Sequence, residues 1–250
     1  MSDLPADSRP AWYAAPPGGR SPWRDWWTIL HPPYTAWNLS YVLIGAGLAP
    51  HIDAERLLGT LLGFALAVGV AAHTLDELKG RPLGTGIASP VLAAAAAVSL
   101  GAAIALGVAG VVRVGVGLIA FVVIGSVVVV AYNLETWGGR LHSDVVFAAG
   151  WGAFPVLTAY FAQTGTLRPA ALLGAAFAYG LSQAQRVLST EARTLRRRVQ
   201  TVEGHRVMTG GSCEPLSRPG LLQPYERALV SLSWSTCALG LGLVAAHVNL

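Results

Sequence analysis

The sequence predicts an all-α membrane protein built as one bundle of about seven transmembrane helices. Composition is the first reason: 53% of the 250 residues are hydrophobic and 12% are charged, while a soluble domain usually carries about twice that share of charge. The second reason is that seven apolar runs are long enough, or nearly so, to cross roughly 30 Å of hydrocarbon. A third is that the basic residues cluster at the ends of these runs.

The seven runs cover 33–49, 57–78, 88–110, 114–134, 145–162, 169–188 and 228–248, of which the first and fifth are short. We expect a single transmembrane domain over 28–250, with a cytoplasmic loop at about 190–227. Residues 1–27 are expected to form a disordered cytoplasmic tail, because most of them are polar and rich in proline and glycine. This tail ends in an interfacial aromatic anchor of Trp23, Trp26 and Trp27.

The lysine and arginine distribution sets the expected orientation. With the N-terminus inside, 14 of the 17 basic residues fall on inner segments, and only Arg56, Arg113 and Arg168 fall outside. By the positive-inside rule, the N-terminus is cytoplasmic and, after seven crossings, the C-terminus is external. A formal net charge of +4 is explained better by an anionic membrane face than by nucleic acid, which we do not expect as a partner.

The first two runs carry different signals. The first begins with an unusually polar stretch that includes Asn38, which we expect to line a cavity. The second contains Gly59 and Gly63, a GxxxG spacing that permits close helix packing.

The second run ends in the most informative stretch of the chain. His73, Asp76, Glu77 and Gly80 follow the i, i+3, i+4, i+7 spacing of one helix face. Lys79 and Arg81 come at the same end, and charged groups in a membrane helix usually mark function. The alternative is a solvated helix end with a basic anchor.

The fourth run ends in Tyr132 and Glu135, and the loop after it contains His142 and Asp144. By the topology count this loop lies on the same face as the end of the second run. The carboxylates and imidazoles of both segments would suit a divalent metal; they are His73, Asp76, Glu77, Glu135, His142 and Asp144. The alternative is ordinary loop polarity with helix capping by Ser143 or Asp144.

The sixth run carries a polar stripe of Tyr179, Ser182, Gln183 and Arg186, with the same helical spacing. Two runs that become polar on one face toward the cytoplasm predict the walls of one cavity. Alternatively, serine and glutamine inside a span bond to neighbouring helices.

These features together resemble the UbiA-type intramembrane prenyltransferases. The resemblance covers roughly residues 28–190 and rests on Leu30-His-Pro-Pro, on Leu43-Ile-Gly-Ala-Gly, on Arg81-Pro-Leu-Gly-Thr-Gly, and on Tyr132 with Arg140 downstream. The chain departs from the family in its acidic motifs. The first is compressed to His73, Asp76 and Glu77, and Ser182, Gln183, Gln185 and Arg186 stand where the family has further aspartates. The family also usually has nine helices.

The resemblance implies a prenyltransferase that joins an isoprenoid diphosphate to a lipid or aromatic acceptor in the bilayer. It implies catalytic roles for Asp76, Glu77 and Tyr132, and Mg²⁺ as cofactor. Phosphate would be bound by cations, which are Lys79, Arg81, Arg140 and Arg186.

Two other functions stay open. One is a non-catalytic isoprenoid- or lipid-binding protein, or one that assists a membrane complex, with the same fold. The other is a metal-dependent membrane enzyme of different chemistry that uses the histidines and carboxylates. A retinal protein is excluded, because the only lysine is Lys79 and none lies in the last span.

Overall fold

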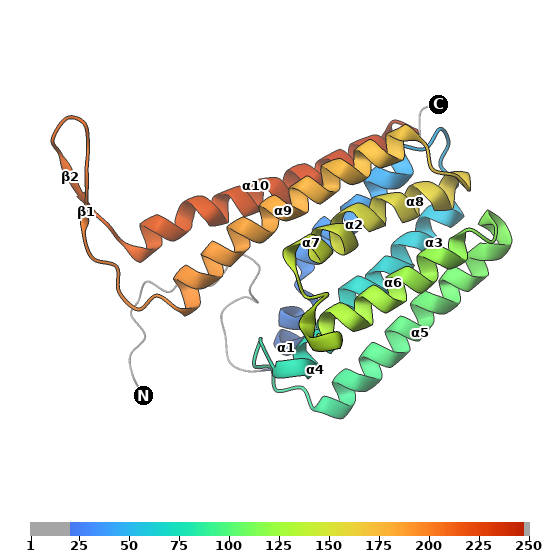
Figure 1. Cartoon of the computed structure of the whole chain (residues 1–250), viewed down its shortest axis with the longest axis horizontal. Helices are drawn as coiled ribbons and strands as arrows, with labels where there is room; N and C mark the ends of the chain where they lie inside the picture. The colour runs from blue at the N-terminus through green and yellow to red at the C-terminus, as the bar shows by residue number, and fades with distance from the viewer. Residues whose placement is uncertain (1–20, 248–250) are drawn as a thin grey trace.

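The computed structural model describes residues 21–247 and shows a bundle of long, roughly parallel helices (Figure 1). Residues 1–20, which include most of the predicted tail, lie outside the described residues. The aromatic anchor is described, and it belongs to helix α1 (Pro22–Leu30). Pro22 occupies the first turn, where its missing N–H costs nothing. The part of the predicted tail at residues 22–27 is therefore helical and not disordered.

The described residues form seven long helical segments that match the seven predicted runs. They are α2 (Pro32–Gly47), α3 (Ala54–Phe64) continued by η1 (Ala65–Ala72) and α4 (His73–Gly80), α5 (Ser89–Val114), α6 (Leu118–Asn133), α7 (Asp144–Phe147) continued by η3 (Ala148–Ala153) and α8 (Phe154–Thr164), α9 (Pro169–Arg197), and α10 (Arg218–Ala245). A short 3₁₀ turn, η2 (Trp137–Gly139), lies between α6 and α7.

Four of these segments are long and apolar enough to cross a membrane, namely Ala54–Gly80, Ser89–Val114, Asp144–Thr164 and Arg218–Ala245. Helix α6 is apolar but shorter, α2 has 16 residues, and α9 carries the polar stripe. The predicted class, a multi-pass helical membrane bundle, is confirmed, and the number of true crossings is close to seven.

Helix α2 packs tightly against its neighbours because its glycines allow close approach. A Cβ on Gly45 would lie 2.3 Å from the Val156 carbonyl oxygen of α8. A Cβ on Gly47 would lie 2.6 Å from Leu243 Cβ of α10. The GxxxG pair of α3 behaves differently, since a Cβ on Gly59 or Gly63 would meet nothing within 4 Å. That pair does not mediate helix packing in this chain.

Two membrane segments contain π-helical turns, η1 and η3. The wider turn is rare and is often found at functional sites. Both stretches are rich in alanine and glycine, whose small side chains leave room for the wider turn. They lie on facing sides of the cavity described below.

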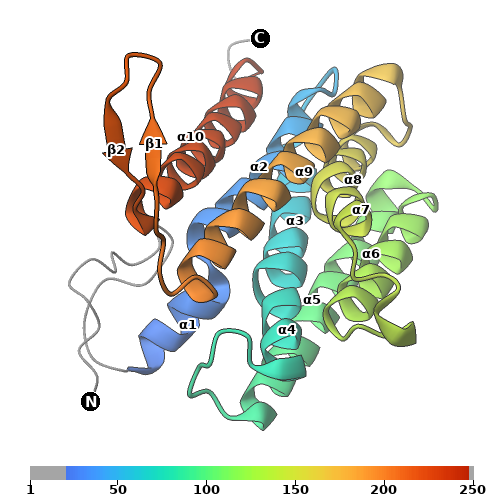
Figure 2. The same cartoon turned by 60° about the vertical axis from the view of Figure 1, so that its left-hand side comes forward.

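Helices α9 and α10 run antiparallel and form an arm that projects beyond the bundle (Figures 1 and 2). Its tip is a hairpin of β1 (His205–Val207) and β2 (Cys213–Pro215), with Arg206 opposite Glu214. The predicted loop over 190–227 is therefore mostly ordered.

The helices of the arm continue the core of the bundle. Leu195 of α9 and Tyr225 of α10 pack against the buried cluster that joins Leu222 to Trp37 and Val156 of the bundle. Arg196 Nε also donates to Glu226 Oε1 at 2.7 Å. The predicted loop began at about residue 190, but α9 continues to Arg197, because only one face of the helix is polar there.

Candidate functional site

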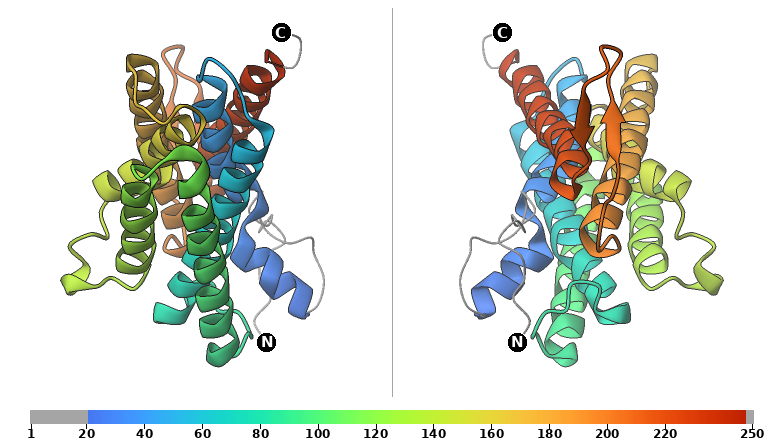
Figure 3. Two further views of the ribbon diagram at one scale, coloured as in Figure 1. Left: turned by 90° about the vertical axis from the view of Figure 1, so that its right-hand side faces the viewer. Right: turned by 90° about the vertical axis from the view of Figure 1, so that its left-hand side faces the viewer.

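Four segments meet at one end of the bundle: α1, the loop after α4, the loop after α6, and the second half of α9 (Figure 3). The two loops are those that sequence analysis placed on the cytoplasmic face. The candidate site lies here.

Asp76 lies at the centre of the charged groups. Its side chain is half-buried on α4, and its charge interacts with those of His142, Glu135 and Arg193. Sequence analysis predicted that Asp76, His142 and Glu135 converge, and it did not include Arg193. The signal for Arg193 was its place on the polar stripe of α9, seven residues after Arg186.

Tyr132 connects this polar group to the apolar interior. Its ring stacks on His142, with centroids 4.4 Å apart and planes 26° apart. On its other side it contacts Trp151, with centroids 4.5 Å apart. The hydroxyl is buried and has no hydrogen-bond partner in the described part of the chain. Such a group costs free energy unless a ligand or water satisfies it.

Asp144 and Arg186 satisfy each other. Arg186 Nε lies 2.7 Å from Asp144 Oδ1, and the guanidinium carbon lies 5.2 Å from the centre of the Phe147 ring. Asp144 is therefore engaged by a cation and is poorly placed to bind a metal. Ser143 caps α7 by accepting a hydrogen bond from the Val146 amide at 3.3 Å. Of the two capping residues that the alternative named, Ser143 is therefore the one that caps the helix.

Glu77 holds the loop that follows α4. It is fully buried, and its carboxylate accepts from the Leu83 amide at 2.9 Å and from the amide and hydroxyl of Thr85, each at 2.8 Å. Glu77 was predicted as a metal ligand and catalytic acid, and in the structure its carboxylate stabilises the Arg-Pro-Leu loop through these hydrogen bonds. Sequence analysis could not separate this role from that of Asp76, because the two are adjacent.

Arg81 also stabilises this loop, through hydrogen bonds from its guanidinium group. It lies in the left-handed region at φ 52°, and its guanidinium donates to the Ile87 carbonyl and to Ser89 Oγ, the latter at 2.7 Å. The Gly86 amide donates to Asp25 Oδ2 of α1 at 3.0 Å. Arg81 therefore points toward the loop rather than toward Asp76. Lys79 and Arg140, the other cations predicted near phosphate, are exposed.

His73 pairs with His31 and not with the carboxylate cluster. The two ring centroids lie 5.4 Å apart, and His73 Nδ1 lies 3.1 Å from the Gly69 carbonyl oxygen. Within residues 21–247 no three histidine, cysteine, aspartate or glutamate side chains are grouped closely enough to hold a metal ion. The predicted six-residue metal cluster does not form, because Glu77, Asp144 and His73 each have other partners.

The polar stripe of α9 is used mainly for helix contacts. Ser182 Oγ donates to Tyr41 Oη of α2 at 3.1 Å, and Gln183 Nε2 donates to Tyr179 Oη at 3.0 Å. Asn38 is buried in α2. None of the four predicted cavity-lining residues borders the large cavity of this structure. The Ser182 bond to α2 agrees with the alternative that such groups bond neighbouring helices, while the Gln183 bond stays within α9.

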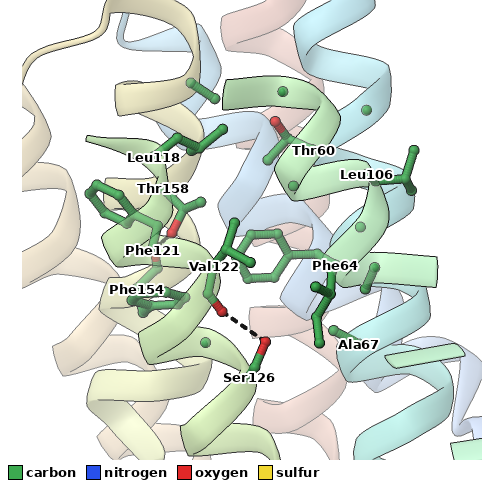
Figure 4. Close-up of a pocket in the computed structure, with 18 of the residues that line it drawn as sticks. Thr60, Phe64, Ala67, Leu106, Leu118, Phe121, Val122, Ser126, Phe154 and Thr158 are labelled. Atoms are coloured by element: carbon green, nitrogen blue, oxygen red, sulfur yellow. Dashed lines mark hydrogen bonds between the residues drawn. The ribbon is translucent and has the colours of Figure 1, made fainter. Parts of the chain in front are cut away.

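The large cavity lies instead among α3–η1, α5, α6 and η3–α8, and has a volume of about 340 Å³ (Figure 4). That is within the range of small-molecule sites. Phe64, Phe121 and Phe154 line its middle, with Phe154 centroids 6.2 Å from Phe64 and 5.9 Å from Phe121. Sequence analysis did not predict a cavity among these helices. A usable signal was the number of glycines and alanines on their inner faces.

The cavity has two unlike ends. At one end it reaches Val129 and Trp151, which belong to the same buried cluster as Tyr132. At the other end it reaches Glu55, Arg56 and Arg113. An apolar space therefore begins at the buried cluster that contains Tyr132 and runs along the helices to a second charged region.

Comparison with known proteins places this geometry among UbiA-like folds. A solved structure of a UbiA homologue from Archaeoglobus fulgidus bound to Cd²⁺ aligns over 90% of this chain and 86% of its own, with a TM-score of 0.50 and 14% identity. At that identity the likeness concerns the fold. The predicted resemblance to the UbiA-type superfamily is confirmed at that level.

Two curated proteins are similar in sequence. Both are named protoheme IX farnesyltransferase and come from Vibrio vulnificus strains YJ016 and CMCP6. The first is 30% identical over 168 residues, which is 62% of this chain and 55% of the relative. The second is 30% identical over 164 residues, 60% of this chain and 54% of the relative. The chain thus spans about half the length of the curated relatives it matches. No protein-family model matches it.

Proposed function

We propose that this protein is a membrane-embedded UbiA-like prenyltransferase, which transfers the hydrocarbon chain of an isoprenoid diphosphate to a lipid or aromatic acceptor. One observation carries the proposal: the charges of Arg186 and Arg193 act on Tyr132, whose buried hydroxyl has no partner in the described residues. Tyr132 also packs in the buried cluster whose Val129 and Trp151 line one end of the long apolar cavity. An isoprenoid diphosphate likewise consists of a charged diphosphate group and an apolar hydrocarbon chain. The relatives named as farnesyltransferases support the same reaction class.

The chain would bind the diphosphate through cations near Tyr132. The charges of Arg186 and Arg193 interact with the Tyr132 side chain, so both guanidinium groups lie within electrostatic reach of a phosphate bound there. Arginine suits this task because its planar fork binds phosphate oxygens in pairs. The Tyr132 hydroxyl would donate to a phosphate oxygen, which would satisfy a group that has no described partner.

Transfer requires the bond between the allylic carbon and the diphosphate oxygen to break while the acceptor attacks that carbon. Negative charge grows on the departing diphosphate, and the arginines would stabilise it most in the transition state. The acceptor's proton would pass to a carboxylate or to water. Asp76, which lies among these charges, is our choice for the carboxylate.

A divalent metal fits this site only with help from the substrate. Magnesium is often bound by one or two carboxylates together with phosphate oxygens and water. Asp76 and Glu135, whose charges interact, would be the protein ligands. Such an ion would neutralise part of the charge on the departing diphosphate. Cadmium in the Archaeoglobus fulgidus homologue is consistent with a divalent ion in this fold and does not select magnesium.

Turnover is the direct test. The purified protein in detergent is incubated with isoprenoid diphosphates and with extracted membrane lipids as acceptors, with and without Mg²⁺, and diphosphate release is measured. We expect release that depends on both the acceptor and the divalent ion. A Tyr132→Phe variant keeps the ring stack and removes the hydroxyl, so it should lower release while leaving the fold intact. Release that ignores both acceptor and metal would contradict the proposal.

One observation favours a non-catalytic lipid-binding role as the second candidate. Glu77 and Arg81, which the family resemblance marks as functional, both hold a loop in this chain. A protein that only binds an isoprenoid would need the cavity and not the acids. Tight binding of isoprenoid lipids with no diphosphate release under any condition would select this role.

A further inference from the structure

We propose that the cavity measures the length of the bound chain, that it accepts about four isoprene units, and that Gly59 and Gly63 set this limit. The inference rests on the proposed function for the identity of the chain. It goes further by giving the size class of the substrate and the residues that select it.

The length follows from the helices that line the cavity. On α5 the lining residues run from Leu100 to Val114, fourteen steps of the helix, or about 21 Å at 1.5 Å per residue. One extended isoprene unit is close to one helical turn in length, roughly 5 Å. A chain of about four units would therefore fill the space between Trp151 and the far end.

The far end is bordered by charged residues. Arg56 donates to the carbonyl of Gln163 at 3.1 Å and to that of Arg113 at 2.7 Å, which ties α3 to the ends of α8 and α5. Arg113 also forms an ion pair with Glu55. A longer apolar chain would have to push its last units into these charges, where they gain nothing from leaving water.

Two glycines on α3 open the cavity along its length. Gly59 and Gly63 line it, lie one helical turn apart, and have no atom within 4 Å of a built Cβ. A side chain added at either position would enter the cavity without striking the backbone. Gly59 is one turn from Arg56 and so lies at the far end, while Gly63 lies one turn nearer Trp151.

The experiment uses chain-length series in two forms, prenyl alcohols and prenyl diphosphates of two, three, four and eight units. Binding of the alcohols to the full protein in detergent is measured by thermal shift. Wild type should bind three- and four-unit chains best. Gly59→Leu should weaken the four-unit alcohol about tenfold or more and spare the three-unit one; Gly63→Leu should weaken both.

Gly101→Leu is the matched control. Gly101 lies on α5, also has open space around its Cβ, and is not among the cavity-lining residues. All three variants gain the same helix propensity from losing a glycine. The control should leave the length preference unchanged.

The outcomes separate this inference from the proposed function. Equal binding of eight-unit and four-unit alcohols to wild type, or unchanged preference in Gly59→Leu and Gly63→Leu, overturns the inference, even if diphosphates are turned over. A length preference that shifts as described supports it, even if no diphosphate is consumed. Bilayer phospholipid that blocks all chain lengths equally would assign the cavity to an acyl chain and also overturn it.

Discussion

At the scale of single residues, Asp76 and Glu77 are adjacent carboxylates with different surroundings. Glu77 is fully buried and accepts three hydrogen bonds from the loop after α4. Asp76 is half-buried among the charges of His142, Glu135 and Arg193. Replacing the carboxylate with its amide should therefore affect ligand binding at Asp76 and stability at Glu77.

We predict that Asp76→Asn abolishes divalent-dependent diphosphate binding and leaves the protein folded, since it removes only the charge that a hard cation requires. Glu77→Gln should instead cost about 2 kcal/mol of stability, because an amide replaces one acceptor oxygen with a donor facing a donor. Isothermal titration with an allylic diphosphate and thermal unfolding in detergent measure the two effects. Binding by Asp76→Asn as tight as wild type would remove Asp76 from the site.

His31 is the second residue with a testable property. It lies between α1 and α2, and its burial lowers the pKa of the imidazole, with Arg197 acting in the same direction and the Ile29 carbonyl and Glu77 opposing. Its pKa in the unfolded chain is about 6.5. The folded protein thus resists protonation, and stability should fall as the pH drops below about 6.5.

His31→Asn tests this prediction. Asparagine tolerates the left-handed backbone that His31 adopts at φ 42°, and it does not titrate. The loss of thermal stability between pH 7 and pH 5 should be smaller in the variant than in wild type. An identical pH profile in both proteins would assign the loss to other groups.

At the scale of elements, the loop between α4 and α5 is fastened from three helices. Glu77 holds its middle, Asp25 of α1 accepts from Gly86 at 3.0 Å, and Arg197 of α9 donates to the Pro82 carbonyl at 3.4 Å. The loop therefore couples the interfacial helix α1 and the arm to the end of α4. The loop directly follows α4, the helix that carries Asp76.

We predict that Arg81→Ala loosens this loop, because it removes the hydrogen bonds to Ile87 and Ser89. Amide hydrogen exchange of residues 83–88 should become faster, and diphosphate binding should weaken. Arg81→Lys should weaken binding less, since lysine keeps the charge and loses the fork. If both variants bind alike and exchange as slowly as wild type, Arg81 does not hold the loop.

At the scale of the whole molecule, charge and topology agree. The end of the bundle that carries the two site loops also carries most of the described arginines. Arg56, Arg113 and Arg168 lie at the other end, near the start of α3, the end of α5 and the start of α9. Because seven helical segments alternate in direction, the start of the first segment and the end of the last lie at opposite ends of the bundle. The candidate site should therefore face the cytoplasm.

We predict a cytoplasmic N-terminus and an external C-terminus. Reporter fusions at residue 1 and residue 250, one active only inside and one only outside, measure this in whole cells. Arg140, in the exposed loop after α6, offers a third position for a reporter on the inner side. Two ends on the same side would require a helix that does not cross.

Composition and periodicity alone determined the class of this protein, the positions of its helical segments and one end as the site. Apolar run length is a local property that the bilayer thickness converts directly into helices. Helical spacing likewise put Asp76 on a polar face, and the topology count put Tyr132, Glu135 and His142 beside it. These predictions need no knowledge of which helices are neighbours.

The tertiary structure decided which predicted residues are available to a ligand and where a hydrocarbon chain would lie. Glu77, Asp144 and Ser182 were reasonable site residues until their partners appeared: a loop, Arg186 and Tyr41. The cavity exists because the side chains of four helical segments leave the space beside Gly59 and Gly63 empty. A glycine that admits a neighbour and one that leaves a void look the same in sequence, because only the packed bundle shows which atoms face it.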